Sequence, residues 1–132
     1  MNYLLDTNIC IHFFRGEFNL LTKFEEIGID NCAISEITLA ELVFGAEKSQ
    51  NPKKNHKLIE DFIEQIAVIP IYSAIYKYGK EKARLCSLGI KVSDFDLLIG
   101  STAVENELVM VTENVNEFER IDGIKIQNWI IR

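Results

Sequence analysis

Strand-like and helix-like patterns alternate along the whole chain, and no other feature limits the possible folds as strongly. Short apolar runs typical of strands lie near Tyr3–Leu5, Cys32–Ile34, Ala67–Ile71, Leu108–Val111 and, more weakly, Ile124–Gln127. Between them, apolar residues repeat at helical spacing. Because parallel strands are joined by helices that cross over the sheet, this order predicts an α/β fold, with a mainly parallel sheet of about four or five strands and helices on both faces.

The length and composition fit one globular domain. The chain has 132 residues, 48% of them hydrophobic and 26% charged, with no repeat, low-complexity segment or Pro/Gly-rich linker. We therefore expect a single domain over residues 1–132. The first residues lack the features of a signal peptide, and no stretch approaches the roughly 18 apolar residues of a membrane span. These observations predict a cytoplasmic protein with no membrane contact.

Cysteine, histidine and glycine patterns argue against several kinds of site. Cys10, Cys32 and Cys86 lack CxxC spacing and each lies in an apolar run, so we expect reduced core thiols instead of disulfides or a zinc site. His12 and His56 are expected at the surface, and no GxSxG motif accompanies them. P-loop and GxGxxG motifs are also absent. Serine-hydrolase and nucleotide-cofactor chemistry therefore have no support.

The formal net charge of −6 argues against a broad basic surface that binds nucleic acid by neutralising phosphates. An acidic chain can still process nucleic acid through a bound metal, with its acids concentrated at one site. Positive surface would then be confined to local stretches such as "NPKKNHK", residues 51–57. For that stretch, a solvated loop is the simpler interpretation.

Polar residues follow several of the expected strands. Asp6 ends the first run, Ser35 leads from the second run into a helix that carries Glu41, and "LVMVTEN" delivers Thr112 and Asn114. The carboxyl ends of parallel strands meet at one edge of a sheet, where ligands of such folds bind. We therefore expect these side chains to converge.

The helix that carries Glu41 is apolar almost all round, which indicates burial on more than one side. Its one polar stripe consists of Thr38, Glu41 and Gly45. Because burying an unpaired carboxylate is costly, we expect Glu41 to project into a polar cleft. The alternative is an exposed acid on a surface helix.

A further helix begins at Ser93 and has Asp94 and Asp96 in its first turn. Ser93 and Asp96 have capping-box spacing, so capping and the helix dipole explain each acid taken alone. However, Asp6, Glu41 and Asp96 would gather without nearby lysines, and they would repel one another unless a cation lay between them. Oxygen ligands of this kind suit Mg²⁺ or Mn²⁺.

Asp94 and Asp96 cannot easily share one metal, because side chains two positions apart on a helix point roughly 200° away from each other. Asp96 is followed by Gly100 and Ala103, a small-residue track that would let its face pack close to the strand bearing Asp6. Asp94 lies nearer the helix start, where exposure and capping explain it. We therefore assign Asp96 to the metal.

Four blocks of the chain resemble the PIN-domain ribonucleases, specifically the VapC-type toxins of toxin–antitoxin pairs. The blocks are "YLLDTNICIHFFRG", "ISEITLAELVFGAEKS", "DFDLLIGSTA" and "VTENVNEFERIDGIKIQNW". They follow the family's order and cover essentially the whole chain. The resemblance implies a PIN-like three-layer α/β/α fold and a metal-dependent endoribonuclease.

The resemblance also implies roles for four residues. Asp6, Glu41 and Asp96 match the family's acidic metal-binding positions, and Asn114 matches a position held by Asp or Asn. In the implied mechanism, Asp6 and Asp96 hold Mg²⁺ or Mn²⁺, and Glu41 helps bind it or orients and deprotonates water. Asn114 hydrogen-bonds a ligand or water. Hydrolysis of the phosphodiester would leave a 5′-phosphate.

Other matching positions support the site or depart from the family pattern. Asn8 and Thr112 match supporting polar residues, and Arg84 falls in a block that often carries arginine. Glu113 stands where Asn is frequent, and Asp94, counted with the supporting residues, replaces a frequently uncharged one. With Asn114 in place of a fourth carboxylate, one or two metals both stay open.

The expected partners follow from the resemblance and from the apolar helix that carries Glu41. The substrate would be RNA, with structured RNA such as tRNA as a candidate, and its cleavage would inhibit translation and growth. We expect a homodimer, covered by a small cognate VapB-type antitoxin that places a basic side chain near the carboxylates.

Two other functions stay open from the sequence. An apolar strand that ends in Asp also occurs in phosphatases with an aspartyl nucleophile, but these need a second Asp two residues on, where this chain has Asn8. The second alternative is a catalytically silent PIN-like interaction domain that binds a partner through its apolar helix.

Overall fold

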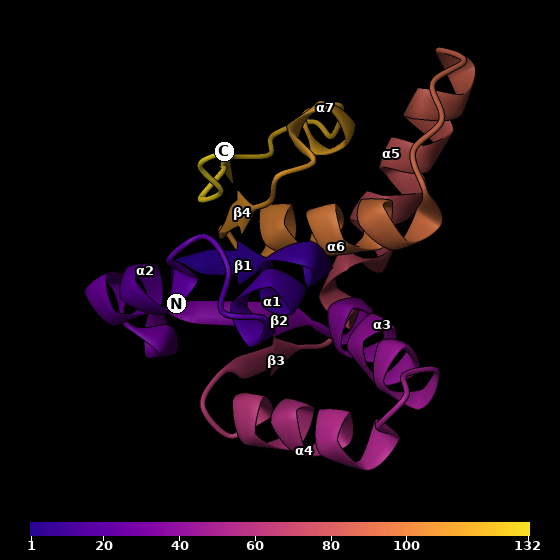
Figure 1. Ribbon diagram of the computed structural model, residues 1–132. Coiled ribbons are helices and arrows are strands. Elements are labelled where there is room, and N and C mark those ends of the chain that lie inside the picture. The colour runs from indigo at the N-terminus through magenta and orange to yellow at the C-terminus, as the bar shows by residue number, and fades with distance from the viewer.

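The computed structural model describes residues 1–132, and a five-stranded sheet forms its centre (Figure 1). The strands lie in the order β3-β2-β1-β4-β5, and every neighbouring pair is parallel. This confirms the predicted α/β fold, with a sheet that is wholly parallel. The strands are Tyr3–Leu5 (β1), Cys32–Ser35 (β2), Ala67–Ile69 (β3), Val109–Val111 (β4) and Ile126–Gln127 (β5).

Helices fill the connections between the strands and cover both faces of the sheet (Figure 1). Two short 3-10 helices, η1 (Ile29–Asn31) and η2 (Tyr72–Ala74), precede β2 and α5. The α-helices are Thr7–Phe14 (α1), Leu20–Ile27 (α2), Glu36–Glu47 (α3), Pro52–Ile63 (α4), Ile75–Ser87 (α5), Asp94–Glu105 (α6) and Val115–Phe118 (α7).

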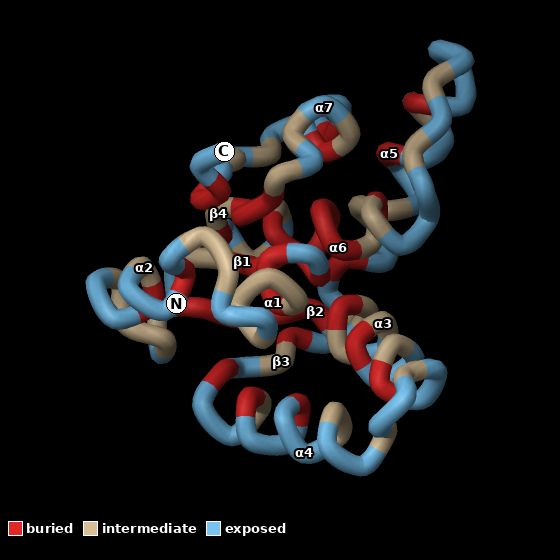
Figure 2. The backbone as a smooth tube through the Cα atoms, viewed as in Figure 1, coloured by how far each residue is buried: buried red, intermediate tan, exposed pale blue.

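Successive residues of the central strand β1 contribute to two separate cores. Leu5 packs in the core that α1, α2, α3 and α4 cover, and Leu4 packs in the core that α5, α6 and α7 cover. Side chains alternate along a strand, so each face of the sheet has its own layer of helices. Figure 2 shows the buried residues along the strands and on the parts of the helices next to them. The molecule therefore has the three-layer α/β/α arrangement.

The local sequence explains where α4 begins, and it corrects one expectation. Asn51 caps this helix by accepting the Lys54 N–H at 3.2 Å, and Pro52 occupies the first turn. Asn at the cap and Pro at the first helical position favour a helix start. The solvated loop expected over residues 51–57 is therefore wrong, because most of this stretch is helical.

Gly100 allows close packing, though against a different neighbour from the one expected. A Cβ atom at this position would clash with Ile121 Cδ1 and would lie 3.3 Å from a Phe118 ring carbon. The small residue thus brings α6 against the segment that follows β4. The expectation that this track packs against β1 is wrong for Gly100, although Ala103 does belong to the core that contains Leu4.

Three expectations about burial hold only in part. The apolar helix α3 packs against α1, α4 and α6, as its burial on more than one side requires, but it is not covered all round, because Val43 and Phe44 are exposed. Cys86 is exposed, whereas Cys10 and Cys32 are buried free thiols as expected. His12 is half-buried: its Nδ1 lies 3.0 Å from Glu17 Oε1 and its ring packs edge-on against Phe18.

None of the helices has both the length and the apolar composition needed to cross a membrane.

Candidate active site

A cleft of ≈ 680 Å³ opens at the carboxyl edge of the sheet. Its walls come from the junction of β1 and α1, from α3, from the first turn of α6 and from the segment after β4. Five of the predicted site residues line it, namely Asp6, Asn8, Glu41, Asp96 and Asn114.

Asp6 is the most deeply placed of these carboxylates, with only 6% of its surface exposed. It caps α1, since its Oδ1 accepts the Thr7 N–H at 2.8 Å, and its Oδ2 accepts the Thr112 hydroxyl at 2.8 Å. Burial raises the pKa of Asp6 to about 6. Repulsion from Asp96 and Glu41 adds to the rise, and the two hydrogen bonds oppose it. The protein alone thus leaves this negative charge poorly compensated.

Thr7 holds Glu41 in place, and the sequence analysis did not single it out. Its hydroxyl donates to Glu41 Oε1 at 2.6 Å and lies 3.2 Å from the hydroxyl of the buried Thr38. The expected polar stripe on α3 is therefore partly a buried hydrogen-bonded contact with α1. Glu41 is half-buried, in agreement with a cleft position. In the sequence, the one indication of this role is that Thr7 lies between two predicted site residues, in the middle of "DTN".

Asp96 also lines the cleft. Its side chain does not complete the capping box that its spacing from Ser93 allows. The Ser93 hydroxyl accepts the Asp96 N–H at 3.1 Å. The return bond of a capping box is missing, because the Ser93 N–H donates instead to Glu117 Oε1 at 3.1 Å. Burial raises the pKa of Asp96, the Ser93 hydroxyl opposes this, and Glu117 and Glu41 add to the rise.

Asp94 lies outside the cleft. Its carboxylate accepts hydrogen bonds from Lys82 Nζ at 2.6 Å and from the Tyr78 hydroxyl at 2.9 Å. The bond from Lys82 is the main reason why the pKa of Asp94 is lowered. The two acids of "SDFD" therefore have different partners, as their helical spacing requires.

Thr112 links the central strand to the segment that carries Asn114. This buried side chain donates to Asp6 and accepts the Asn114 N–H at 2.9 Å. Asn114 itself is exposed and lines the cleft. Thr112 thus lies behind the cleft wall and orients two of its residues.

Glu117 is a second residue that the sequence analysis missed. It lies on α7, one turn beyond Asn114, and it is close enough to Asp96 to raise the pKa of that carboxyl. Its hydrogen bond to Ser93 ties α7 to the start of α6. The sequence feature that could have indicated Glu117 is its spacing of three residues from Asn114 within "ENVNEF", which places both on one side of a helix.

Lys48 lines the cleft as well, so the expectation that the acids gather without a nearby lysine is wrong. Its ammonium lies 5.1 Å from the centre of the Phe44 ring. It is exposed and forms no ion pair with any carboxylate of the chain. Lys48 therefore does not neutralise Asp6, Glu41 or Asp96.

The residues of the cleft fit a hard divalent cation in their chemistry. Three carboxylates and two amide side chains line it, and no histidine or cysteine does. The raised pKa of Asp6 is the further sign that a positive charge would be stabilised here. The side chains do not form a ready-made cluster of three ligands, so joint coordination requires them to move closer together.

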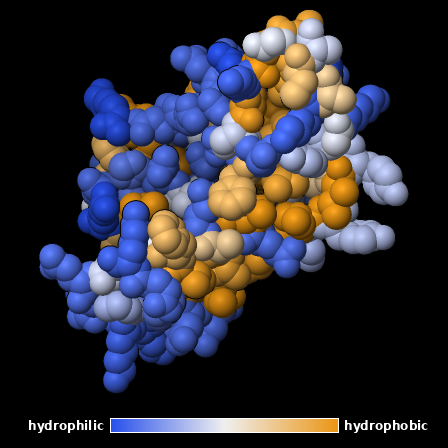
Figure 3. All heavy atoms as spheres, turned by 90° about the vertical axis from the view of Figure 1, so that its right-hand side faces the viewer, coloured by the Kyte–Doolittle hydropathy of each residue, from blue (hydrophilic) through white to orange (hydrophobic).

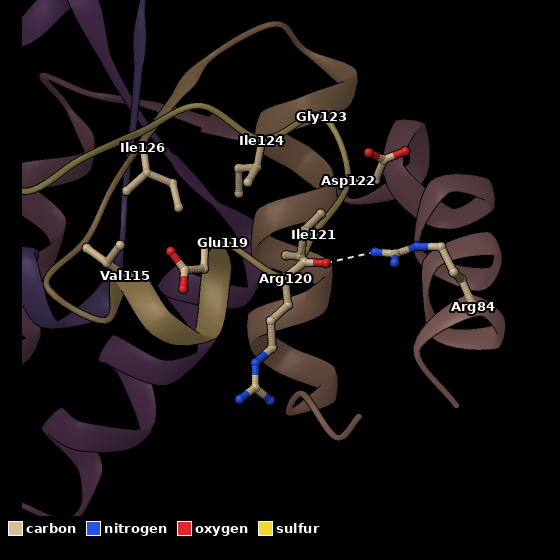
Figure 4. Close-up of a pocket in the computed structure, with 9 residues that line it drawn as sticks. All are labelled: Arg84, Val115, Glu119, Arg120, Ile121, Asp122, Gly123, Ile124 and Ile126. Atoms are coloured by element: carbon tan, nitrogen blue, oxygen red, sulfur yellow. Dashed lines mark hydrogen bonds between the residues drawn. The ribbon is translucent and has the colours of Figure 1, made fainter. Parts of the chain in front are cut away.

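A separate hollow of ≈ 530 Å³ lies between α5 and the chain that follows α7 (Figure 4). Arg84 lies at its edge and donates to the Arg120 carbonyl at 2.7 Å. None of its lining residues belongs to the carboxylate cleft. Arg84, noted from the family resemblance, is therefore placed away from the predicted site.

Comparison with known proteins gives consistent results over the whole chain. The PIN domain family model matches residues 3–124. The tRNA(fMet)-specific endonuclease VapC of Shigella flexneri is 35% identical over 130 residues, which span 98% of each chain. Ribonuclease VapC2 of Haemophilus influenzae is 35% identical over 134 residues, which span 98% of this chain and 99% of the relative.

Solved structures show the same relationship. A crystal structure of DNA-bound VapBC from Salmonella typhimurium contains a chain with a TM-score of 0.91 and 37% identity, and the match covers 98% of each chain. VapBC-1 from nontypeable Haemophilus influenzae gives a TM-score of 0.87 at 33% identity, again over 98% of each chain. The chain therefore belongs to the PIN-domain family and, within it, to the VapC-type ribonuclease toxins.

Proposed function

We propose that this ribonuclease depends on Mg²⁺ or Mn²⁺ and that Asp6, Glu41 and Asp96 are its metal-binding carboxylates. The observation that carries the proposal is the buried Asp6, whose pKa is raised to about 6 beside two further acids. A bound divalent cation would offset this repulsion, polarise the phosphate and lower the pKa of a bound water. Clusters of perturbed carboxylates in a cleft are typical of functional sites.

The remaining residues have separate tasks in this proposal. Glu41, held by the Thr7 hydroxyl, helps bind the cation or orients and deprotonates the attacking water. Asn114 hydrogen-bonds a ligand or water at the opposite wall, and Asn8 adds an amide to the same cleft. Thr112 orients Asp6. Attack in line with the leaving 3′-oxygen leaves a 5′-phosphate on the product.

A tRNA is the substrate that we propose. The proposal is supported by two relatives that match over nearly their full length, from Shigella flexneri and Salmonella typhimurium. Each of them is a tRNA(fMet)-specific endonuclease. The test is incubation of purified protein with initiator tRNA, elongator tRNAs and single-stranded RNA, in Mg²⁺, Mn²⁺ or EDTA, with the product ends mapped. We expect cleavage of initiator tRNA only with divalent metal. Intact RNA under every condition would instead favour the silent interaction domain.

A cognate VapB-type antitoxin and a second copy of the chain are the proposed protein partners. Related toxins occur in VapBC complexes, which supports the antitoxin. Figure 3 shows apolar side chains gathered on one face of the molecule. Such areas mark interaction sites. The large exposed apolar residues of α3, of η2 and of the first turn of α5 support a homodimer: Val43, Phe44, Tyr72, Ile75 and Tyr76.

Size measurement tests the dimer, and purification from the native host tests the antitoxin. We expect twice the monomer mass in solution, and a small partner whose basic side chain blocks the carboxylates. A monomer at high concentration that co-purifies with no partner would contradict both proposals.

A further inference from the structure

A second hollow, a groove of ≈ 500 Å³ between α1, α3 and α4, continues directly from the carboxylate cleft. The groove and the cleft share four lining residues, Ile11, Glu41, Gly45 and Lys48. The two hollows therefore form one depression, with the acids at one end.

The groove carries a local excess of positive charge on an acidic protein. Arg15, Lys48 and Lys54 line it, and Glu41 is the only acid that does. All three cations are exposed, and none forms an ion pair. With a net charge of −6 for the whole chain, this concentration complements an anionic ligand. Spaced cations along a groove suit the successive phosphates of a nucleic-acid strand.

Gly45 gives an independent indication that a ligand approaches the backbone here. It lies inside α3, where glycine is less favourable than alanine. Packing does not require it, because a Cβ atom at this position would meet nothing within 4 Å. Glycine is also used where a ligand comes close to the main chain. Since Gly45 lines both hollows, such a ligand would pass from the groove into the cleft.

We infer that the groove binds the phosphate backbone of the RNA on one side of the scissile bond. The strand passes over Gly45, with Lys48 nearest the carboxylates and Arg15 and Lys54 farther along. The inference rests on the proposed ribonuclease function and adds the residues that hold the substrate. It also explains how a protein with a net charge of −6 retains RNA beside a cleft lined by carboxylates.

The first test measures binding of initiator tRNA as a function of salt in an Asp96→Asn background. We expect Arg15→Met, Lys48→Met and Lys54→Met each to weaken binding roughly three- to tenfold and to reduce the salt-dependence slope by about 0.7 to 0.9. A merely structural role would leave that slope unchanged. Lys53→Met is the matched control, because Lys53 is exposed on the same helix as Lys54 and lines neither hollow.

The second test uses Gly45→Ala, which separates stability from activity. We expect a higher unfolding midpoint, because alanine favours the helix, together with at least about tenfold slower single-turnover cleavage. Gly79→Ala is the matched control: Gly79 is an exposed helical glycine on α5 whose added Cβ would also meet nothing within 4 Å. It should raise the midpoint similarly and leave cleavage unchanged.

Two outcomes would overturn the inference. One is wild-type salt dependence in all three cation variants. The other is undiminished cleavage by Gly45→Ala combined with lost inhibition by the antitoxin, which would assign the groove to that partner alone. The first test measures binding alone and does not depend on RNA cleavage. If the wild-type protein cleaved no RNA, the proposed function would fail, whereas reduced salt slopes would still support the groove.

Discussion

Two buried carboxylates of this molecule, Asp6 and Glu81, have opposite surroundings. Both are almost inaccessible, at 6% and 2% exposure. Glu81 accepts two hydrogen bonds from Arg84, at 2.9 and 3.0 Å, and one from the Asp122 N–H. The Arg84 bond is the main reason why the pKa of Glu81 is lowered. Asp6 accepts hydrogen bonds from uncharged donors, the Thr7 N–H and the Thr112 hydroxyl, and burial together with repulsion from Asp96 and Glu41 raises its pKa.

The difference shows that burial of an acid does not by itself indicate function. Glu81 is paired, and its bonds fasten the segment after α7 to α5, which is a structural task. Asp6 keeps a charge that no cation of the protein neutralises, which is the arrangement that favours an external cation. The variants below test this contrast, beginning with the largest expected effect.

Asp6→Asn should stabilise the protein in the absence of divalent metal. The pKa of Asp6 is raised from 3.8 to about 6 on folding, so the native state binds the proton more tightly, and stability falls as the pH rises through this interval. At about 1.36 kcal/mol per pH unit, the variant should gain roughly 3 kcal/mol near neutral pH. Denaturant unfolding of both proteins across this pH range measures the difference.

Mn²⁺ should raise the melting temperature of the wild-type protein, because the cation would bind only the native state, and Asp6→Asn should lose this rise. An undiminished Mn²⁺ effect in Asp6→Asn, or a stability difference that does not change with pH, would show that Asp6 is compensated in the way that Glu81 is.

Asp96→Asn should lower RNA cleavage at least about a hundredfold, which is the scale of removing a catalytic electrostatic group. Asp94→Asn is the matched control, and it should cost about tenfold or less, because Asp94 is bonded to Lys82 and Tyr78 outside the cleft. Single-turnover rates provide the measurement. If Asp94→Asn were the more damaging change, the metal would have been assigned to the wrong acid.

Glu81→Gln should destabilise the protein by about 2 kcal/mol, because it weakens a buried charge pair and leaves Arg84 without its carboxylate. Since the folded-state pKa of Glu81 is lowered, its contribution is present above the unfolded pKa and is lost as the pH falls through the folded value. Denaturant unfolding and cleavage per folded molecule are the measurements. Glu60→Gln, at an exposed acid without an ion pair, is the control. Reduced cleavage with unchanged stability would give Glu81 a functional role.

Thr7→Val should slow cleavage by about tenfold, equivalent to about 1.4 kcal/mol, because it removes the hydrogen bond that orients Glu41. Thr22→Val on the exposed side of α2 is the control. Wild-type cleavage by Thr7→Val, measured at saturating enzyme, would mean that Glu41 needs no support from α1.

The sheet and three acids of the cleft were predictable because they follow a topological rule. Residues that end parallel strands, such as Asp6 and Thr112, must meet at one edge once the strands are paired. Glu41 and Asp96 lie within the helices that begin there. The position of α4 was also encoded in the sequence, since Asn51 and Pro52 form a helix start, but the lysines that follow favoured a loop.

Other features depend on contacts between distant segments, which no local pattern reveals. Glu117 competes with Asp96 for the Ser93 N–H only because α7 packs beside α6. Lys48 reaches the cleft because three positions beyond Gly45 it returns to the same side of α3. The exposed residues of α3 are as apolar as those of a buried helix face. The sequence alone therefore predicted that this face is buried.

The pairing of the central strand has a consequence for synthesis of this protein. β1 is translated before β4, yet its register is completed by β4, more than a hundred residues later along the chain. Thr112, which orients Asp6, emerges later still. The carboxylate cleft can therefore be assembled only after the ribosome has translated β4 and Thr112, so its geometry forms late relative to Asp6, Glu41 and Asp96 themselves.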